Sequence, residues 1–156
     1  MDDTIFQPSD LAGAKRTEFL DAAREGLARL RDKDGTSLVM LPESKLQLLQ
    51  TLAKWWECYT NLESVLQRGA RPKVADLGEL AWLRQFDLDD LREFSDELHE
   101  ALIAAGADGD ARVLNECVHQ WHVTARQLED PLRCSILLGN PVSEDFIEVD
   151  EPNVDG

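Results

Sequence analysis

The stretch Leu27-Ala28-Arg29-Leu30-Arg31, Asp32-Lys33-Asp34-Gly35-Thr36, Ser37-Leu38-Val39-Met40-Leu41 decides the fold of this 156-residue chain. Its first five residues alternate apolar and basic side chains, which is typical of a strand with one buried face. Lys33-Asp34-Gly35 supplies the chemistry of a tight turn, and the last five residues form an apolar strand. We therefore predict a β-hairpin over residues 27–41.

On the N-terminal side of this hairpin, the sequence predicts one strand and one helix. Thr4-Ile5-Phe6-Gln7 is a short candidate strand, and Pro8 ends it. Ser9 and Asp10 are residue types that begin helices, because their side chains accept hydrogen bonds from the first free N–H groups. A single helix is therefore expected from there to about Glu25, with Gly26 as its C-terminal stop.

On the C-terminal side, apolar residues recur at helical spacing. Pro42-Glu43-Ser44 opens the longest predicted helix, which runs to about Gln67. Its apolar stripe advances alternately by four and three residues, which fits either a coiled-coil seam or an ordinary core face. The stripe consists of Leu48, Leu52, Trp55, Tyr59, Leu62 and Leu66. Further helices are expected over about residues 73–86, 89–105 and 110–129, with Gly106 capping the second of them.

Together these elements predict an α+β fold in three parts. Residues 1–60 form a small strand–helix–hairpin–helix module, and residues 61–140 form a mostly helical region. Residues 141–156 combine Pro, Asn, Val and acidic residues without periodicity, so we expect a disordered acidic tail. Its apolar anchors are Phe146, Ile147 and Val149, which we assign as partner-binding candidates.

Charge is distributed unevenly along the chain, whose formal net charge is -15. The first fifty residues carry seven Lys or Arg and nine Asp or Glu, whereas the remainder carries nine and 22. An acidic C-terminal half repels nucleic acid and attracts a basic protein, so any DNA contact is expected in the first third. No apolar run is long enough to span a membrane, and the first residues lack a secretory signal, so we expect a cytoplasmic protein.

Three further groups of residues fit ordinary structural roles better than a metal site or a catalytic site. Asp32-Lys33-Asp34-Gly35 lacks the further oxygen ligands of a calcium loop. Cys117, His119 and His122 suggest zinc, but one helix does not bring all three together. The carboxylates between residues 87 and 100 favour a solvated or partner-binding helix face over catalysis, and no ordered catalytic signature is present. We therefore expect no enzyme, metal or cofactor. Of the four tryptophans, Trp56 lies off the apolar stripes and is a further partner-binding candidate.

Three segments resemble the N-terminal module of Phd/YefM (prevent-host-death) antitoxins: Phe6-Gln7-Pro8-Ser9-Asp10-Leu11, Glu18 to Gly26, and Arg31 to Leu41. The likeness lies in the element order, the glycine after the first helix and the Asp-Gly turn before an apolar strand. The segment from Trp82 to Ala125 is similar, more weakly, to the helical extension of some actinobacterial prevent-host-death proteins. Family members commonly place an arginine early in the first helix, where this chain has Ala12-Gly13-Ala14.

The resemblance implies a type II antitoxin that forms a homodimer, neutralises a cognate toxin and represses its own operon by binding operator DNA. The candidates for phosphate contact are Lys15, Arg16, Arg29, Arg31 and Lys33, of which the two hairpin arginines share one strand face. A basic toxin fits the acidic C-terminal half. The alternatives are a helical adaptor with a non-toxin partner, or a transcriptional regulator without a toxin, either one retaining the antitoxin-like module.

Overall fold

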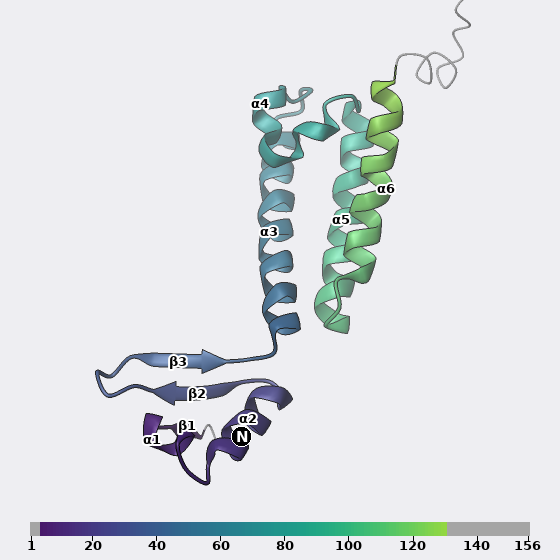
Figure 1. Ribbon diagram of the computed structural model, residues 1–156. Helices are drawn as coiled ribbons and strands as arrows, with labels where there is room; N and C mark the ends of the chain where they lie inside the picture. The colour runs from purple at the N-terminus through teal and green to yellow at the C-terminus, as the bar shows by residue number, and fades with distance from the viewer. Residues whose placement is uncertain (1–3, 131–156) are drawn as a thin grey trace, which may run out of the picture.

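The structure of the protein is a computed structural model that describes residues 4–130. It is an α+β fold in which a small three-stranded sheet precedes a layer of long helices. Figure 1 shows the sheet at the N-terminal end of helix α3, with three long helices standing side by side beyond it. The predicted tail over residues 141–156 lies outside the described residues.

The sheet has the strand order β1-β2-β3, in which β1 is Ile5–Phe6, β2 is Ala28–Arg31 and β3 is Ser37–Met40. β1 pairs parallel to β2, and β2 pairs antiparallel to β3 with Arg29 opposite Val39. Residues 32–36 connect β2 to β3, and Gly35 in this turn has a φ of 87°. Because alternate residues face opposite sides of a strand, Ala28 and Leu30 share one face of β2 while its two arginines share the other.

The single helix predicted from residue 9 to residue 25 is wrong, because the structure has two helices there. α1 is Pro8–Leu11 and α2 is Arg16–Glu25. Between them the N–H of Gly13 bonds to the carbonyl of Asp10, and the N–H of Arg16 bonds to the carbonyl of Gly13. These three-residue turns replace the α-helical pattern beside a glycine, which disfavours a helix interior by about 1 kcal/mol relative to alanine.

The sheet and α2 enclose a small core of four buried side chains. These are Phe6, Phe19, Ala23 and Ala28. The rings of Phe6 and Phe19 meet edge to face with their centroids 5.2 Å apart. Residues 4–42, which contain these elements, are called the β-module below.

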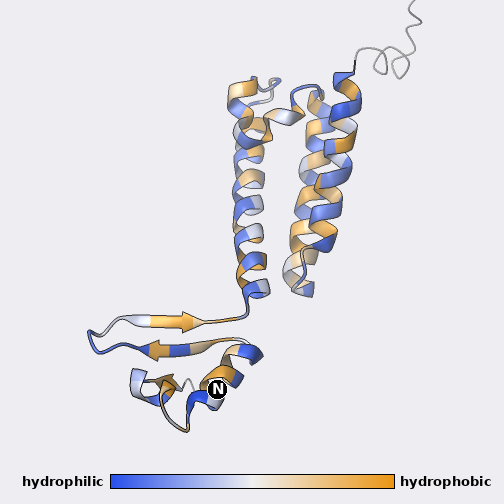
Figure 2. Ribbon diagram, viewed as in Figure 1, coloured by the Kyte–Doolittle hydropathy of each residue, from blue (hydrophilic) through white to orange (hydrophobic). Residues whose placement is uncertain are grey.

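The helical region contains α3, Glu43–Leu66; α4, Val74–Leu77; the 3-10 helix η1, Gly78–Leu83; α5, Leu88–Asp108; and α6, Arg112–Glu129. α5 packs against both α3 and α6. Phe94, Leu98 and Leu102 of α5 are almost completely buried in the core that these helices share. Figure 2 shows that apolar and polar residues alternate along the long helices, whereas β3 is largely apolar.

The apolar stripe of α3 proves to be a core face and not a coiled-coil seam. Leu62 and Leu66 are buried in the helical core, and Leu52, Trp55 and Tyr59 pack against it. The predicted boundary at residue 60 thus falls inside α3, whose C-terminal half belongs to the larger core.

Two further predictions about helix ends are wrong for reasons that involve glycine. The helix predicted over residues 73–86 breaks at Gly78, whose φ of 53° favours glycine, and continues as η1. Gly106 does not cap α5 but lies within it. The cap is Gly109, which has a left-handed φ of 65° and donates its N–H to the carbonyl of Ala105.

We expect Asp87→Ala to destabilise the fold, because Asp87 caps α5. Its carboxylate accepts hydrogen bonds from the N–H groups of Asp89 and Asp90, both at 2.9 Å. Loss of such a cap costs about 1 kcal/mol, and urea unfolding followed by tryptophan fluorescence measures this loss. Glu93→Ala, on the exposed side of the same helix, is the control; equal loss in both variants would contradict the capping role.

Candidate interaction surfaces

The first candidate surface is strand β3, whose side chains remain exposed. Leu38, Val39 and Met40 are 48%, 58% and 45% exposed. α2 packs mainly against β2, and β3 is the edge strand of the sheet. A depression of about 240 Å³ lies beside β3, between α2 and the connection to α3, lined by Leu20, Ala23, Arg24, Met40, Leu41 and Pro42. An exposed apolar edge strand beside a core this small fits a surface that another chain covers.

The five basic residues predicted to contact DNA are all exposed, but they do not form one patch. Arg29 and Arg31 face away from the buried Ala28 side of β2. Lys15 and Arg16 lie at the N-terminal end of α2. Because β1 and β2 are parallel, the chain between them must run back along the sheet, so α2 begins near the end of β2 at Arg31. Lys33 lies in the turn beyond that end. The structure therefore places four of the five toward one end of the β-module, on two sides of the sheet.

Acidic groups accompany these basic residues. Lys15 Nζ lies 3.8 Å from the carboxylate of Asp10. In the turn after β2, the carboxylate of Asp34 accepts a hydrogen bond from the N–H of Thr36 at 2.8 Å, and this bond lowers the pKa of Asp34. Residues 4–60 carry eight Lys or Arg and eight Asp or Glu, so this part of the chain has no net charge.

The second candidate surface is the outer face of α5. Its carboxylates Asp89, Glu93, Asp96 and Glu100 are exposed and follow one another at spacings of four, three and four residues. This spacing puts them on one side of the helix, opposite the buried Leu91, Phe94, Leu98 and Leu102. Residues 61–130 carry seven Lys or Arg against fifteen Asp or Glu, so the helical region is acidic as a whole.

Trp56 of α3 packs against two neighbouring rings. Its indole is 38% exposed and meets Tyr59 and His99 edge to face, with centroids 5.7 Å apart in each case. Tyr59 and His99 stack on each other at 4.8 Å. Desolvation raises the pKa of the Tyr59 phenol, and the nearby carboxylates of Glu63 and Asp96 add to this effect.

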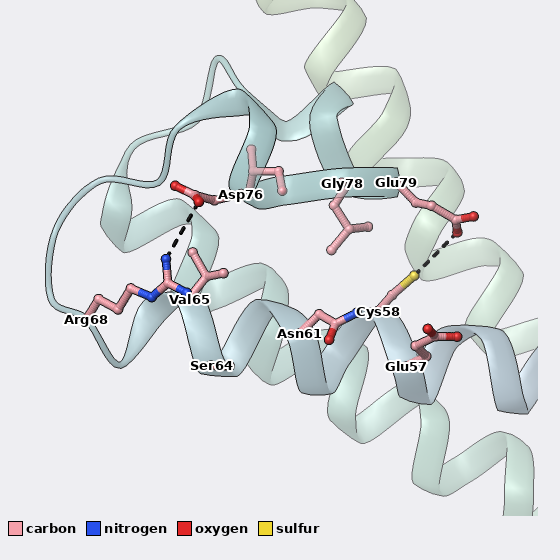
Figure 3. A pocket seen from close by; sticks show the side chains of 11 residues that line it. Glu57, Cys58, Asn61, Ser64, Val65, Arg68, Asp76, Gly78 and Glu79 are labelled. Carbon is pink, nitrogen blue, oxygen red and sulfur yellow. Dashed lines mark hydrogen bonds and ion pairs between the residues drawn. The ribbon is translucent and has the colours of Figure 1, made fainter.

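A cavity of about 340 Å³ lies between α3 and the α4–η1 segment. Figure 3 shows the side chains that line it. The side chain of Arg68 reaches Asp76 across its mouth at 3.6 Å, and the thiol of Cys58 lies 3.8 Å from the carboxylate of Glu79. Burial raises the pKa of the Cys58 thiol, and the negative charge of Glu79 raises it further. Both effects disfavour the thiolate, which is the nucleophilic form of cysteine.

Cys117, His119 and His122 have separate environments on α6. Cys117 packs against the helical core, His119 is exposed, and His122 stacks on Trp82 with ring centroids 3.7 Å apart. Within residues 4–130, no group of three His, Cys, Asp or Glu side chains is placed to hold a metal ion. In the same part of the chain, no helix combines the length and apolar character needed to cross a membrane.

Sequence reasoning named Trp56 but missed other exposed apolar residues. The sequence predicted a strand that contains Leu38 and Met40 but gave these residues no binding role. A largely apolar strand beside a short helix could have indicated an exposed apolar surface. Leu46 and Leu49 on α3 are 44% and 51% exposed and were also missed. Phe146, Ile147 and Val149 lie outside the described residues.

Comparison of the chain with protein-family models, with curated proteins and with solved structures found no match.

We expect the stability of the protein to fall as the pH drops below about 6.5, the ordinary pKa of histidine, in part because of His122. Desolvation lowers the pKa of His122, and the positive charge of Arg126 and the neighbouring His119 lower it further. The unfolded chain therefore binds this proton at a higher pH than the folded one, so acidification favours unfolding.

The measurement is the free energy of unfolding at several pH values between neutral and mildly acidic. His122→Gln removes this titration and should flatten the pH dependence, whereas His119→Gln, on the exposed side of α6, keeps most of it. An unchanged slope in His122→Gln would show that His122 titrates alike in both states.

Proposed function

We propose that the protein is the antitoxin of a type II toxin–antitoxin pair, acting in the cytoplasm by occupying its partner rather than by catalysis. The observation that carries this proposal is the separation of charge between the two parts of the chain. Residues 4–60 are neutral and expose apolar side chains, whereas residues 61–130 have a net charge of -8. This division suits a protein that pairs with itself through one part and binds a basic partner through the other.

The β-module supplies the pairing function in this proposal. Four buried side chains are a small core for some forty residues, and small domains commonly need a further contact for stability. A second copy that covers Leu38 and Met40 on β3 would bury apolar surface at about 25 cal/mol per Å². Strand β1, helix α2 and the β2–β3 hairpin follow in the order that the resemblance to the Phd/YefM module implies, with the short α1 between β1 and α2.

The helical region supplies the binding surface for the toxin. The carboxylate line of α5 is rigidly held, because the opposite side of the helix is buried between α3 and α6. A nucleic-acid-handling toxin carries basic residues where its substrate binds, and an ordered row of carboxylates matches such a surface. Occupying that surface neutralises the toxin and requires no catalytic residue.

We expect neutralisation to depend on the carboxylates of α5. The candidate toxin is a small basic protein that copurifies with this chain, arrests growth when expressed alone and is harmless when both are expressed. Glu93→Gln, Asp96→Asn and Glu100→Gln combined should weaken its binding at least tenfold, measured by calorimetry, and restore growth arrest. Glu18→Gln, Asp21→Asn and Glu25→Gln combined make the same charge change on exposed α2 and should bind normally.

Two outcomes would count against the proposal. If both triple variants bound with equal affinity, the surface of α5 would not be the site. If no copurifying protein were toxic, the interpretation as an adaptor with a non-toxin partner would replace the interpretation as an antitoxin.

Operator binding is a second proposed activity, favoured by the placement of Lys15, Arg16, Arg31 and Lys33 toward one end of the β-module. We expect Arg16→Gln and Lys33→Gln together to weaken binding to the DNA upstream of the reading frame. The slope of log affinity against log salt should fall by about one for each lost phosphate contact.

Fluorescence anisotropy at about 50 to 200 mM salt measures this slope. Arg24→Gln, which removes a cation paired with Asp21 near the other end of α2, is the control. The same salt slope in all variants would exclude this end of the β-module as the DNA contact. Absence of any specific DNA binding would favour an antitoxin that neutralises its toxin but does not repress its operon.

A further inference from the structure

Helix α3 has a second apolar face whose side chains stay partly exposed within residues 4–130. Leu46, Leu49 and Trp56 are 44%, 51% and 38% exposed, and Ala53 between them is also exposed. At 100° per residue these four positions cluster on one side of α3, centred roughly 120° around the helix from the stripe that enters the helical core. The four residues are called the outer stripe below.

The spacing of the outer stripe is that of a helix-pairing seam. Its members follow one another at three, four and three residues, which is the a–d–a–d pattern of two heptads. The small Ala53 sits between larger neighbours, so a facing helix can approach closely at the middle of the stripe. Trp56 is already fixed by Tyr59 and His99, so its indole loses little side-chain freedom when it is covered.

Charge identifies the partner that fits this face. Residues 43–60 carry two lysines and two glutamates, so this segment is neutral in a chain whose formal net charge is -15. A second acidic copy is repelled by most of the helical region but meets no net repulsion here. A strongly basic protein or a nucleic acid would gain no electrostatic attraction along the same face.

We infer that a second copy of this chain docks along the outer stripe, so that the two α3 helices pair in parallel. Only Leu41 and Pro42 separate β3 from α3, so the open face of β3 and the outer stripe are consecutive along the chain. A copy that covers both surfaces must place its own β-module at the same end, which makes the helices parallel. This inference rests on the proposed pairing of two copies and is independent of the toxin.

The first test measures the oligomeric state of the full chain by sedimentation equilibrium. Wild-type protein should be a dimer, and Leu49→Glu with Trp56→Glu should raise the dissociation constant at least tenfold. Ile103→Glu with Val113→Glu, at exposed apolar positions of α5 and α6, is the matched control and should remain dimeric. A monomeric wild-type protein, or a stripe variant that dimerises as tightly as the control, would overturn the inference.

The second test reports on helix direction and does not depend on a charged substitution that disturbs folding. In a parallel symmetric pair Leu46 faces its own counterpart, so Leu46→Cys should form a disulfide-linked dimer on mild oxidation, which wild-type protein should not form. An antiparallel pair would separate the two copies of residue 46, and absence of the cross-link in a dimeric sample would overturn the parallel arrangement.

Neutralisation assays on the same variants separate this inference from the proposed function. A cross-linked Leu46→Cys dimer without any toxin partner would leave the pairing intact and remove the antitoxin role. Conversely, a stripe variant that stays dimeric but no longer binds the toxin would assign the outer stripe to the toxin and reject the inference.

Discussion

Burial of one side of α5 between α3 and α6 is the constraint on which the rest of the structure depends. Phe94, Leu98 and Leu102 supply almost fully buried side chains to a core shared with both neighbouring helices. Because these residues recur at four-residue spacing, their side of α5 is excluded from water along much of the helix. The carboxylates are thereby confined to the other side, where charged groups avoid the cost of desolvation.

The same packing gives α3 its role as the connection between the two parts of the molecule. Its C-terminal half belongs to the helical core through Leu62 and Leu66, whereas its N-terminal end continues directly from the sheet. Contacts at this junction are sparse; one is the hydrogen bond from Lys45 Nζ to the carbonyl of Gly26, at 3.5 Å. The placement of the β-module therefore depends mainly on the short connection through Leu41 and Pro42.

Much of the fold was predictable because long helices and short strands carry strong periodic patterns. The stripe from Leu48 to Leu66 predicted α3 within one residue at its C-terminal end. The breaks at Gly13 and Gly78 were not predictable, since each depends on local turns that compete closely with helix formation. The surfaces that could bind a partner were harder to predict from the sequence than the helix ends. Exposure of Leu46 and Leu49 is decided by which side of α3 meets α5, and α5 is distant in the sequence.

The balance of buried surface explains why the two parts of the chain make different demands on a partner. The helical region buries large side chains from four segments and encloses its own core, so its outer acidic face is free to serve binding without a stability cost. The β-module encloses four side chains, two of them alanines, and leaves the apolar residues of β3 in water. Hydrophobic stabilisation grows with the apolar area removed from water, so this module gains more from a covering chain than the helices do. The two surfaces differ in the partner that their charge favours, because a like chain meets no net repulsion at the neutral module, whereas the acidic helices attract basic proteins.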